Sequence, residues 1–188
     1  MKNEIEQPWI EAGFGLFANE GPAGLKVDTI ARKVGISRSS FYHHFADLDI
    51  FQEKLLAYHT IRSQQAIEKL NRCTTIDPDL LLAIVEEKEY VLFNRQLRVN
   101  RHIPAYKTAF EKAIALESKA IIGAWAQMLS LEQTPEVAEN IYRITADIFF
   151  HRLTAENINY PWLQVFLKEI IIFISEVKTN SLPHSNPG

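Results

Sequence analysis

The spacing of the apolar residues is the feature that most constrains the fold of this chain. Apolar residues recur every three or four positions along nearly its whole length, which places them on one side of an α-helix. The interruptions fall at residues that begin or end helices, such as Gly35, Pro104 and Pro161. No segment shows the alternating pattern of a half-buried strand. The 188 residues therefore predict an all-α protein.

The interruptions also predict where each helix lies. The expected helices span residues 8–20, 27–34, 37–45, 48–72, 78–101, 104–130, 135–158 and 161–178. Pro8 and Pro78 are assigned to first turns and Asp77 to a cap. In the helix after Asp47, the expected inward residues are Ile50, Leu55, Tyr58, Ile61 and Ile67. Residues 181–188 contain two prolines and are expected to be disordered.

Composition excludes several classes of protein. With 47% hydrophobic and 23% charged residues, the chain has the balance of a globular protein. A single cysteine, Cys73, excludes an internal disulfide and favours a reducing compartment. The densest apolar run, Ile170 to Ile174, is far shorter than the ~20 residues that span a bilayer. We therefore expect a cytoplasmic protein that does not enter a membrane.

Residues 27–45 hold two short helices separated by a turn that contains Gly35. Helices this short must pack across a neighbour, which is the arrangement of a helix-turn-helix. The charged residues between Thr29 and Ala46 are all basic: Arg32, Lys33 and Arg38. The net charge of −3 excludes a globally basic surface but not such a local patch. Small side chains at Ser39 and Ser40 would allow the second helix to approach base edges.

Two runs in this region have a familiar order. They are Leu16-Phe17-Ala18-Asn19-Glu20-Gly21 and Thr29-Ile30-Ala31-Arg32-Lys33-Val34-Gly35-Ile36-Ser37-Arg38-Ser39-Ser40-Phe41-Tyr42-His43-His44-Phe45. Together they resemble the DNA-binding domain of TetR-family transcriptional regulators, over roughly the first fifty residues. The resemblance implies a three-helix DNA-binding domain at residues 1–47 and a helical dimerisation and effector-binding domain at residues 48–180.

The resemblance also implies roles for individual residues. Tyr42 and the backbone near Ser37 would contact phosphate, and Arg38, Ser39 and His43 would face DNA. With the basic patch and the small residues, the expected DNA-binding set is Arg32, Lys33, Ser37, Arg38, Ser39, Ser40, Tyr42 and His43. The residues expected to be internal are Ala31, Val34, Phe41 and Phe45.

Three positions depart from the family pattern. Lys26 stands where a capping Ser or Thr is usual, so the second helix begins with a weak cap. Leu48 replaces a common phosphate-binding lysine, and Glu4 and Glu6 make the N-terminal arm acidic. With fewer phosphate contacts, we expect modest DNA affinity and a shallow dependence on salt.

Glu117 lies within the apolar side of the helix at residues 104–130. A buried carboxylate needs a partner, so two interpretations are open. Glu117 either pairs with a cation such as Lys88 or an arginine of the preceding helix, or lines a pocket for a small-molecule effector. In the second case the expected effector-binding residues are Tyr90, Arg98, Glu117, Trp125 and Tyr142.

The last two expected helices each have two apolar sides. A peripheral helix of a monomer needs only one, so the second side predicts pairing with another copy of the chain in a four-helix bundle. A helix buried in the middle of its own domain is the alternative. The expected interface residues are Tyr142, Phe149, Leu153, Trp162, Val165, Ile172 and Phe173.

The sequence contains no metal-binding, phosphate-loop or nucleophile motif. It therefore predicts no catalytic activity, no metal and no cofactor. The function favoured is a homodimeric regulator of transcription, most simply a repressor, which binds a near-palindromic site on double-stranded DNA and responds to an effector. The alternative is a dimeric ligand sensor or protein-binding adaptor with weak or lost DNA binding.

Overall fold

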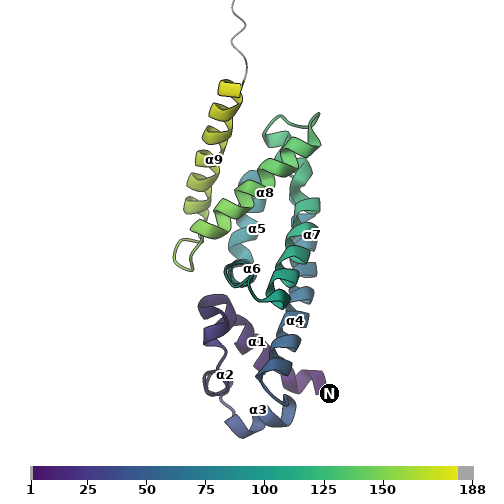
Figure 1. The fold of residues 1–188 in the computed structure, drawn as a ribbon, viewed down its shortest axis with the longest axis vertical. Coiled ribbons are helices and arrows are strands. Elements are labelled where there is room, and N and C mark those ends of the chain that lie inside the picture. The colour runs from purple at the N-terminus through teal and green to yellow at the C-terminus, as the bar shows by residue number, and fades with distance from the viewer. Residues whose placement is uncertain (1, 182–188) are drawn as a thin grey trace, which may run out of the picture.

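The computed structural model describes residues 2–181, with the side chains of residues 5–176, and every regular element in this range is helical (Figure 1). The α-helices are α1 Lys2–Glu20, α2 Val27–Val34, α3 Arg38–His44, α4 Leu48–Leu70, α5 Leu81–Glu86, α6 Lys88–Val99, α7 Pro104–Met128, α8 Pro135–Arg152 and α9 Tyr160–Ser181. A short 3₁₀ helix, η1 Gly21–Gly24, follows α1, and a π-helical turn, η2 Ile76–Leu80, precedes α5. The all-α prediction is confirmed. The tail expected to be disordered lies, from residue 182, outside the described residues.

Three predicted boundaries are wrong, two because of packing and ion pairs between helices and one because of a local side-chain hydrogen bond. Helix α1 begins at Lys2 and contains Pro8, since buried residues on both sides of the proline, Glu6 and Trp9, hold this segment in place. The helix expected over residues 78–101 is divided at Glu87, whose carboxylate binds cations of α4. Helix α8 ends six residues early, where Asn157 Nδ2 donates to the Arg152 carbonyl.

The segment before α5 also differs from the prediction. Asp77 does not cap this helix, because its carboxylate accepts hydrogen bonds from Tyr160 Oη at 2.5 Å and from Gln164 Nε2 at 3.2 Å. The carboxylate of Asp79 instead accepts hydrogen bonds from the backbone amides of Thr74 and Thr75. The Asp77 carboxylate thereby joins η2 to α9.

The turn between α2 and α3 has the predicted form. Gly35 adopts φ 77°, which is the left-handed region that glycine enters without strain. The amides of Gly35 and Ile36 both donate to the carbonyl of Ala31, at 2.9 and 3.1 Å. The two short helices pack on α1 through Trp9, whose ring meets Phe41 edge to face at 5.7 Å. This arrangement is the expected helix-turn-helix.

The two expected domains share one hydrophobic core. Phe93 of α6 stacks on Phe14 of α1 at 4.3 Å and tilts against Phe17 at the same distance. Helix α4 runs from the end that carries α3 up along α7 (Figure 1). Aromatic packing between α1 and α6 therefore fixes the three N-terminal helices to the C-terminal helices.

The buried side of α4 differs from the expected one. Ile50 and Ile61 are exposed. The line of buried residues is Phe51, Leu55, His59, Ser63 and Ala66. Polar His59 and Ser63 occupy inward positions because α6 supplies hydrogen-bond partners for both, which apolar periodicity cannot show.

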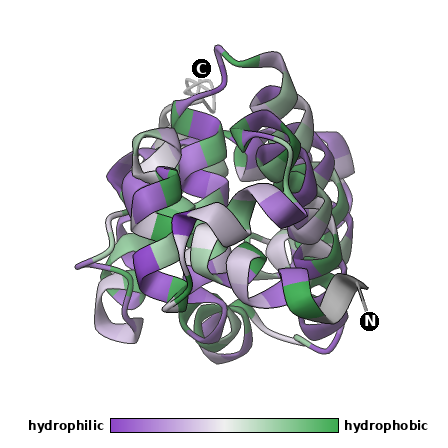
Figure 2. Ribbon diagram, turned by 90° about the horizontal axis from the view of Figure 1, so that it is seen from below, coloured by the Kyte–Doolittle hydropathy of each residue, from purple (hydrophilic) through white to green (hydrophobic). Residues whose placement is uncertain are grey.

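A second cluster of buried apolar residues joins α5, α7 and α9 at the other end of the molecule. Seen from below, hydrophilic and hydrophobic residues alternate along the helices, as expected for helices with one buried side (Figure 2). Within residues 2–181, no helix combines the length and the apolar character that crossing a membrane requires.

Candidate nucleic-acid interface and internal cavity

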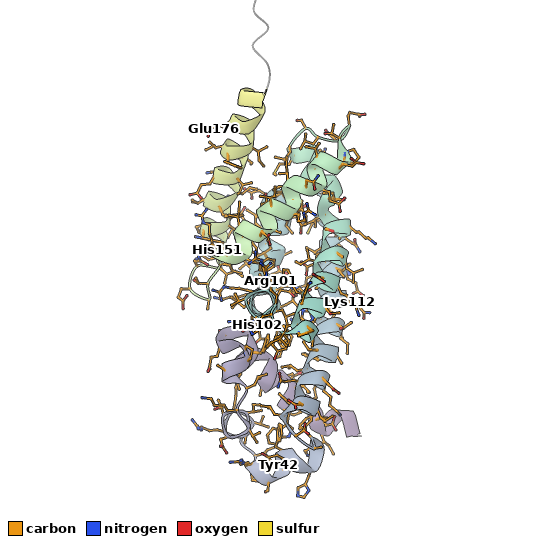
Figure 3. All side chains as sticks on the ribbon, viewed as in Figure 1. Tyr42, Arg101, His102, Lys112, His151 and Glu176 are labelled. Carbon is orange, nitrogen blue, oxygen red and sulfur yellow. The ribbon has the colours of Figure 1, made fainter. Side chains whose placement is uncertain are left out.

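Helix α3 lies at the outer end of the molecule and presents polar residues to solvent. Arg38, Ser39, Tyr42 and His43 are exposed, while Phe41 and Phe45 on the opposite side are completely buried. Tyr42 is 46% exposed and lies at the tip of the molecule, far from Glu176 of α9 (Figure 3). The side of α3 expected to face DNA is thus the side that is free.

Arg38 has two neighbours on this surface. Its guanidinium lies 6.0 Å from the centre of the Tyr42 ring and 3.3 Å from both carboxylate oxygens of Asp28. Hydrogen bonding to Tyr42 and the charge of Asp28 raise the pKa of Arg38. Arg38 is therefore always cationic, and Asp28 competes with any phosphate or base for it.

The serines that begin α3 bind one another. Ser37 Oγ lies 3.0 Å from Ser39 Oγ and 3.1 Å from Ser40 Oγ, and it accepts no hydrogen bond from the backbone amides of α3. The hydroxyls satisfy each other instead, so the first amides of α3 have no side-chain acceptor from Ser37. Helix-terminal amides that no side chain caps are available to bind a phosphate.

The expected basic residues of α2 do not all reach this surface. Arg32 is exposed, and so is Lys33. Lys33, however, lines a groove between α1, α2, α4 and α6. The Nζ atom of Lys33 lies next to Gly15 of α1, 3.1 Å from the position that a Cβ atom would take there. The short helix α2 thus directs this side chain toward α1, and the role of Lys33 in DNA binding stays a prediction.

The three departures from the family pattern have different outcomes. Lys26 precedes α2 without a side-chain cap, as predicted. Leu48 is half-buried against the core, and Asp47 caps α4 by accepting from the amide of Ile50 at 2.9 Å. The prediction of an acidic N-terminal arm is wrong for Glu6, which is buried within α1 and paired with Lys54. The side chain of Glu4 lies outside the described residues.

A cavity of about 130 Å³ lies among helices α4 to α9. Most of its wall is apolar, with Ile121, Phe149 and Leu163 among the lining residues. Tyr90, Glu117, Trp125 and Tyr142 line it as well, and Trp125 meets Tyr142 edge to face at 5.9 Å. Four of the five residues expected around an effector are thus brought together.

The fifth expected residue, Arg98, lies elsewhere. Its guanidinium binds Asp147 Oδ1 of α8, with Nη2 at 2.8 Å and Nε at 3.0 Å, and it does not line the cavity. A partner on the adjacent helix outcompetes the cavity for this cation, so the prediction that Arg98 is a polar contact of the pocket is wrong.

Glu117 has no cationic partner among the described residues. Its Oε1 accepts from Tyr90 Oη at 2.5 Å and from Asn94 Nδ2 at 3.3 Å. Burial raises the pKa of Glu117 to about 7, although these hydrogen bonds favour the ionised form and oppose the rise. Of the two interpretations of Glu117, the ion pair is wrong and the cavity is where the carboxyl lies.

Sequence reasoning missed the polar network behind Glu117. His59 Nε2 donates to Asn94 Oδ1 at 2.8 Å, and Tyr90 Oη lies 3.0 Å from Ser63 Oγ. The His59 ring stacks on Tyr90 and Phe93, and burial lowers its pKa to about 4. The only signal in the sequence was a polar pair, His59 and Ser63, four residues apart.

The outer face of α8 and α9 exposes large apolar residues. On α9, Val165, Ile172 and Phe173 are more than half exposed, as predicted for an interface. On α8 the exposed apolar residues are Val137 and Ile144.

The remaining expected interface residues point into their own subunit. Leu153 is fully buried, Phe149 and Trp162 are half-buried in the core, and Tyr142 lines the cavity. The predicted interface side of α8 is therefore wrong, because its aromatic residues pack on α7 and α9.

Comparison with known proteins agrees with this geometry. Residues 10–47 match the model of the family described as "Bacterial regulatory proteins, tetR family". Through residues 10–47 the chain is therefore similar to this family. No curated protein matches the chain.

Solved structures of the TetR family share the fold over nearly the whole chain. One assigned to the family, from Rhodococcus sp., is 20% identical with a TM-score of 0.55, and covers 93% of this chain and 98% of its own. A TetR-like transcriptional regulator from Rhodococcus sp. RHA1 is 16% identical with a TM-score of 0.57 over 90% and 94%. A third, from Mesorhizobium loti MAFF303099, is 14% identical with a TM-score of 0.54 over 92% and 98%. The C-terminal helices therefore have the TetR fold as well.

Proposed function

We propose that the protein is a DNA-binding regulator of transcription, a repressor that occupies its operator as a homodimer and leaves it when an effector binds. The observation that carries this proposal is the exposure of Arg38, Ser39, Tyr42 and His43 on a short helix whose opposite side is anchored by Phe41 and Phe45. Such a helix fits the major groove, which is about 12 Å wide. The likeness to TetR-family regulators supports a regulatory rather than a catalytic role.

The dimer is proposed from the apolar face formed by Val137, Ile144, Val165, Ile172 and Phe173. Large apolar residues left exposed on α8 and α9 favour an interaction surface there. Two-fold pairing of this face places the two α3 helices at the far ends of the two subunits. The operator would be near-palindromic, with half-sites about one helical turn apart or somewhat more.

Release by an effector is proposed from the position of the cavity. Asn94, which lines it, binds His59, and His59 stacks on Phe93, which packs on Phe14 of the DNA-binding domain. A ligand that fits one arrangement of these side chains better than another would shift the position of α1 relative to α6. The two α3 helices would then no longer match successive grooves.

A gel-shift titration with the DNA upstream of the protein's own gene tests the proposal. Retardation that survives an excess of unrelated DNA is expected of a regulator that controls its own promoter. A dimer that retards neither this DNA nor any fragment selected from random duplexes would support the adaptor with lost DNA binding instead.

A further inference from the structure

We propose that the cavity takes a small organic cation: a hydrophobic body about the size of one aromatic ring, whose ammonium pairs with Oε2 of Glu117. The ligand class follows from the cavity itself, and only its effect on DNA rests on the proposed function.

The size and the wall of the cavity set the body of the ligand. The cavity has a volume of about 130 Å³, and an apolar cavity of ~150 Å³ is known to hold benzene. Ile121, Phe149 and Leu163 supply apolar contacts. One ring with a short substituent matches this space, whereas a sugar or nucleotide would leave its polar groups without partners.

The unpaired carboxylate sets the charge. Both hydrogen bonds to Glu117 reach Oε1, and no donor in residues 5–176 reaches Oε2. The other charged residues of the wall compensate each other: Lys69 Nζ lies 2.5 Å from Glu87 Oε1, and Glu87 also binds Arg62 at 3.0 Å. Glu117 is thus the one uncompensated charge that faces the cavity within the described residues.

The groups around Glu117 favour a cation over other ligands. An anion would be repelled by the carboxylate at close range. Tyr90, Trp125 and Tyr142 surround the site with aromatic rings, whose faces attract cations. The titratable groups nearest to Glu117 are Tyr90 of α6, Tyr142 of α8 and, through Asn94, His59 of α4. Burial raises the pKa of both tyrosines and keeps them neutral.

Calorimetric titration of the full chain without DNA tests the proposal with two probes of equal size, 2-phenylethylamine and the neutral 2-phenylethanol. At pH 7.5 the amine is expected to bind about tenfold tighter or more, since hydrogen bonds to charged groups are the stronger ones. Its advantage should fall between pH 7.5 and 5.5 as Glu117 takes up a proton. The Glu117→Gln variant should bind the two probes about equally.

Two further variants separate the site from the fold. Glu111→Gln makes the same change at an exposed position of α7 and should leave amine binding unchanged. Ile121→Phe fills part of the cavity while it keeps the Glu117 carboxylate, and it should abolish binding of both probes. Equal affinity for amine and alcohol, no binding of the amine, or amine binding that survives Glu117→Gln would overturn the proposal. Because no DNA is present, each of these results leaves the proposed DNA binding to its own test.

Discussion

Arg38 and Tyr42 act together on the exposed side of α3. The guanidinium is held near the Tyr42 ring and Asp28 before any DNA arrives, so part of the ordering that binding requires has already taken place. Both residues were predicted for DNA from the sequence, and their exposure follows from the burial of Phe41 and Phe45 on the other side. The contact with Asp28 was not predictable, since the two lie ten positions apart.

Replacing Tyr42 or Arg38 by alanine should weaken specific DNA binding by about 1–3 kcal/mol each, because each removes one contact of the reading helix. The midpoint of thermal unfolding should stay nearly unchanged, since both side chains are exposed. Fluorescence anisotropy with a labelled operator measures the affinity, and Glu111→Ala on α7 is the control. If both variants bind like the parent, α3 is not the reading helix.

The Asp28→Asn variant should bind DNA more tightly than the parent. The change removes a carboxylate that lies 3.3 Å from Arg38 and that repels phosphates on the same surface. The same anisotropy titration, repeated over a series of salt concentrations, checks this. An unchanged or lower affinity would mean that Asp28 serves to position Arg38 rather than to compete for it.

The burial of Glu117 predicts how the stability of the protein depends on pH. Its pKa rises from 4.5 in the unfolded chain to about 7 in the folded protein, so the folded state holds more protons between these values and loses stability as pH rises through them. The free energy of unfolding of Glu117→Gln, relative to that of the parent, should therefore increase between pH 4.5 and pH 7 by on the order of 3 kcal/mol.

Denaturant unfolding at several pH values tests this prediction, and it also measures how His59 contributes to stability. With its pKa lowered from 6.5 to about 4, His59 makes the parent more stable as pH rises from 4 to 6.5, against the trend from Glu117. The variant should thus show a rise over this range that the parent lacks. Parallel pH profiles of parent and variant would contradict this account, because they would show that Glu117 has the same pKa in the folded protein as in the unfolded chain.

At the scale of helices, the sequence predicted which helices exist better than where each one begins and ends. Helix α2 ends at Gly35, and α7 and α8 begin at Pro104 and Pro135, as expected. The division at Glu87 depends on partners more than fifteen positions away on α4, and the early end of α8 on a hydrogen bond from the side chain of Asn157. The side of α8 that faces outward also escaped prediction, because Tyr142 and Val137 belong to two apolar stripes of equal strength. Only the rings that α8 meets on α7 and α9 decide between them.

Charge placed on the outer face of α8 and α9 should produce monomers. Ile144→Glu, Ile172→Glu and Phe173→Glu each introduce a carboxylate twice into a symmetric apolar contact, and DNA affinity should fall with the dimer. Ile61→Glu is a matched control, since Ile61 is also exposed but lies on α4. Analytical ultracentrifugation distinguishes the two states, and a dimer that persists in all three variants would place the interface on another surface.

The whole molecule joins three features along its length: α3 at one end, the cavity in the middle and the apolar face of α8 and α9 toward the other end (Figures 1 and 3). The sequence predicted α3 as the exposed helix, left the cavity as one of two interpretations of Glu117, and predicted the exposed apolar residues of α9 but not those of α8. It did not predict that one core would run from Phe14 through Phe93 to the polar network of His59, Asn94 and Glu117. Buried polar residues carry no periodic signal, so only the folded arrangement shows how cavity and DNA-binding domain are connected.

Sequencing of the genomic fragments that the purified protein retains measures the central claim most directly. Enriched fragments are expected to share a near-palindromic site whose half-sites lie about one helical turn apart or somewhat more, and Tyr42→Ala is expected to lose this enrichment. Fragments without a common site, or a site that Tyr42→Ala retains with equal strength, would contradict the assignment of this protein as a regulator that reads DNA through α3.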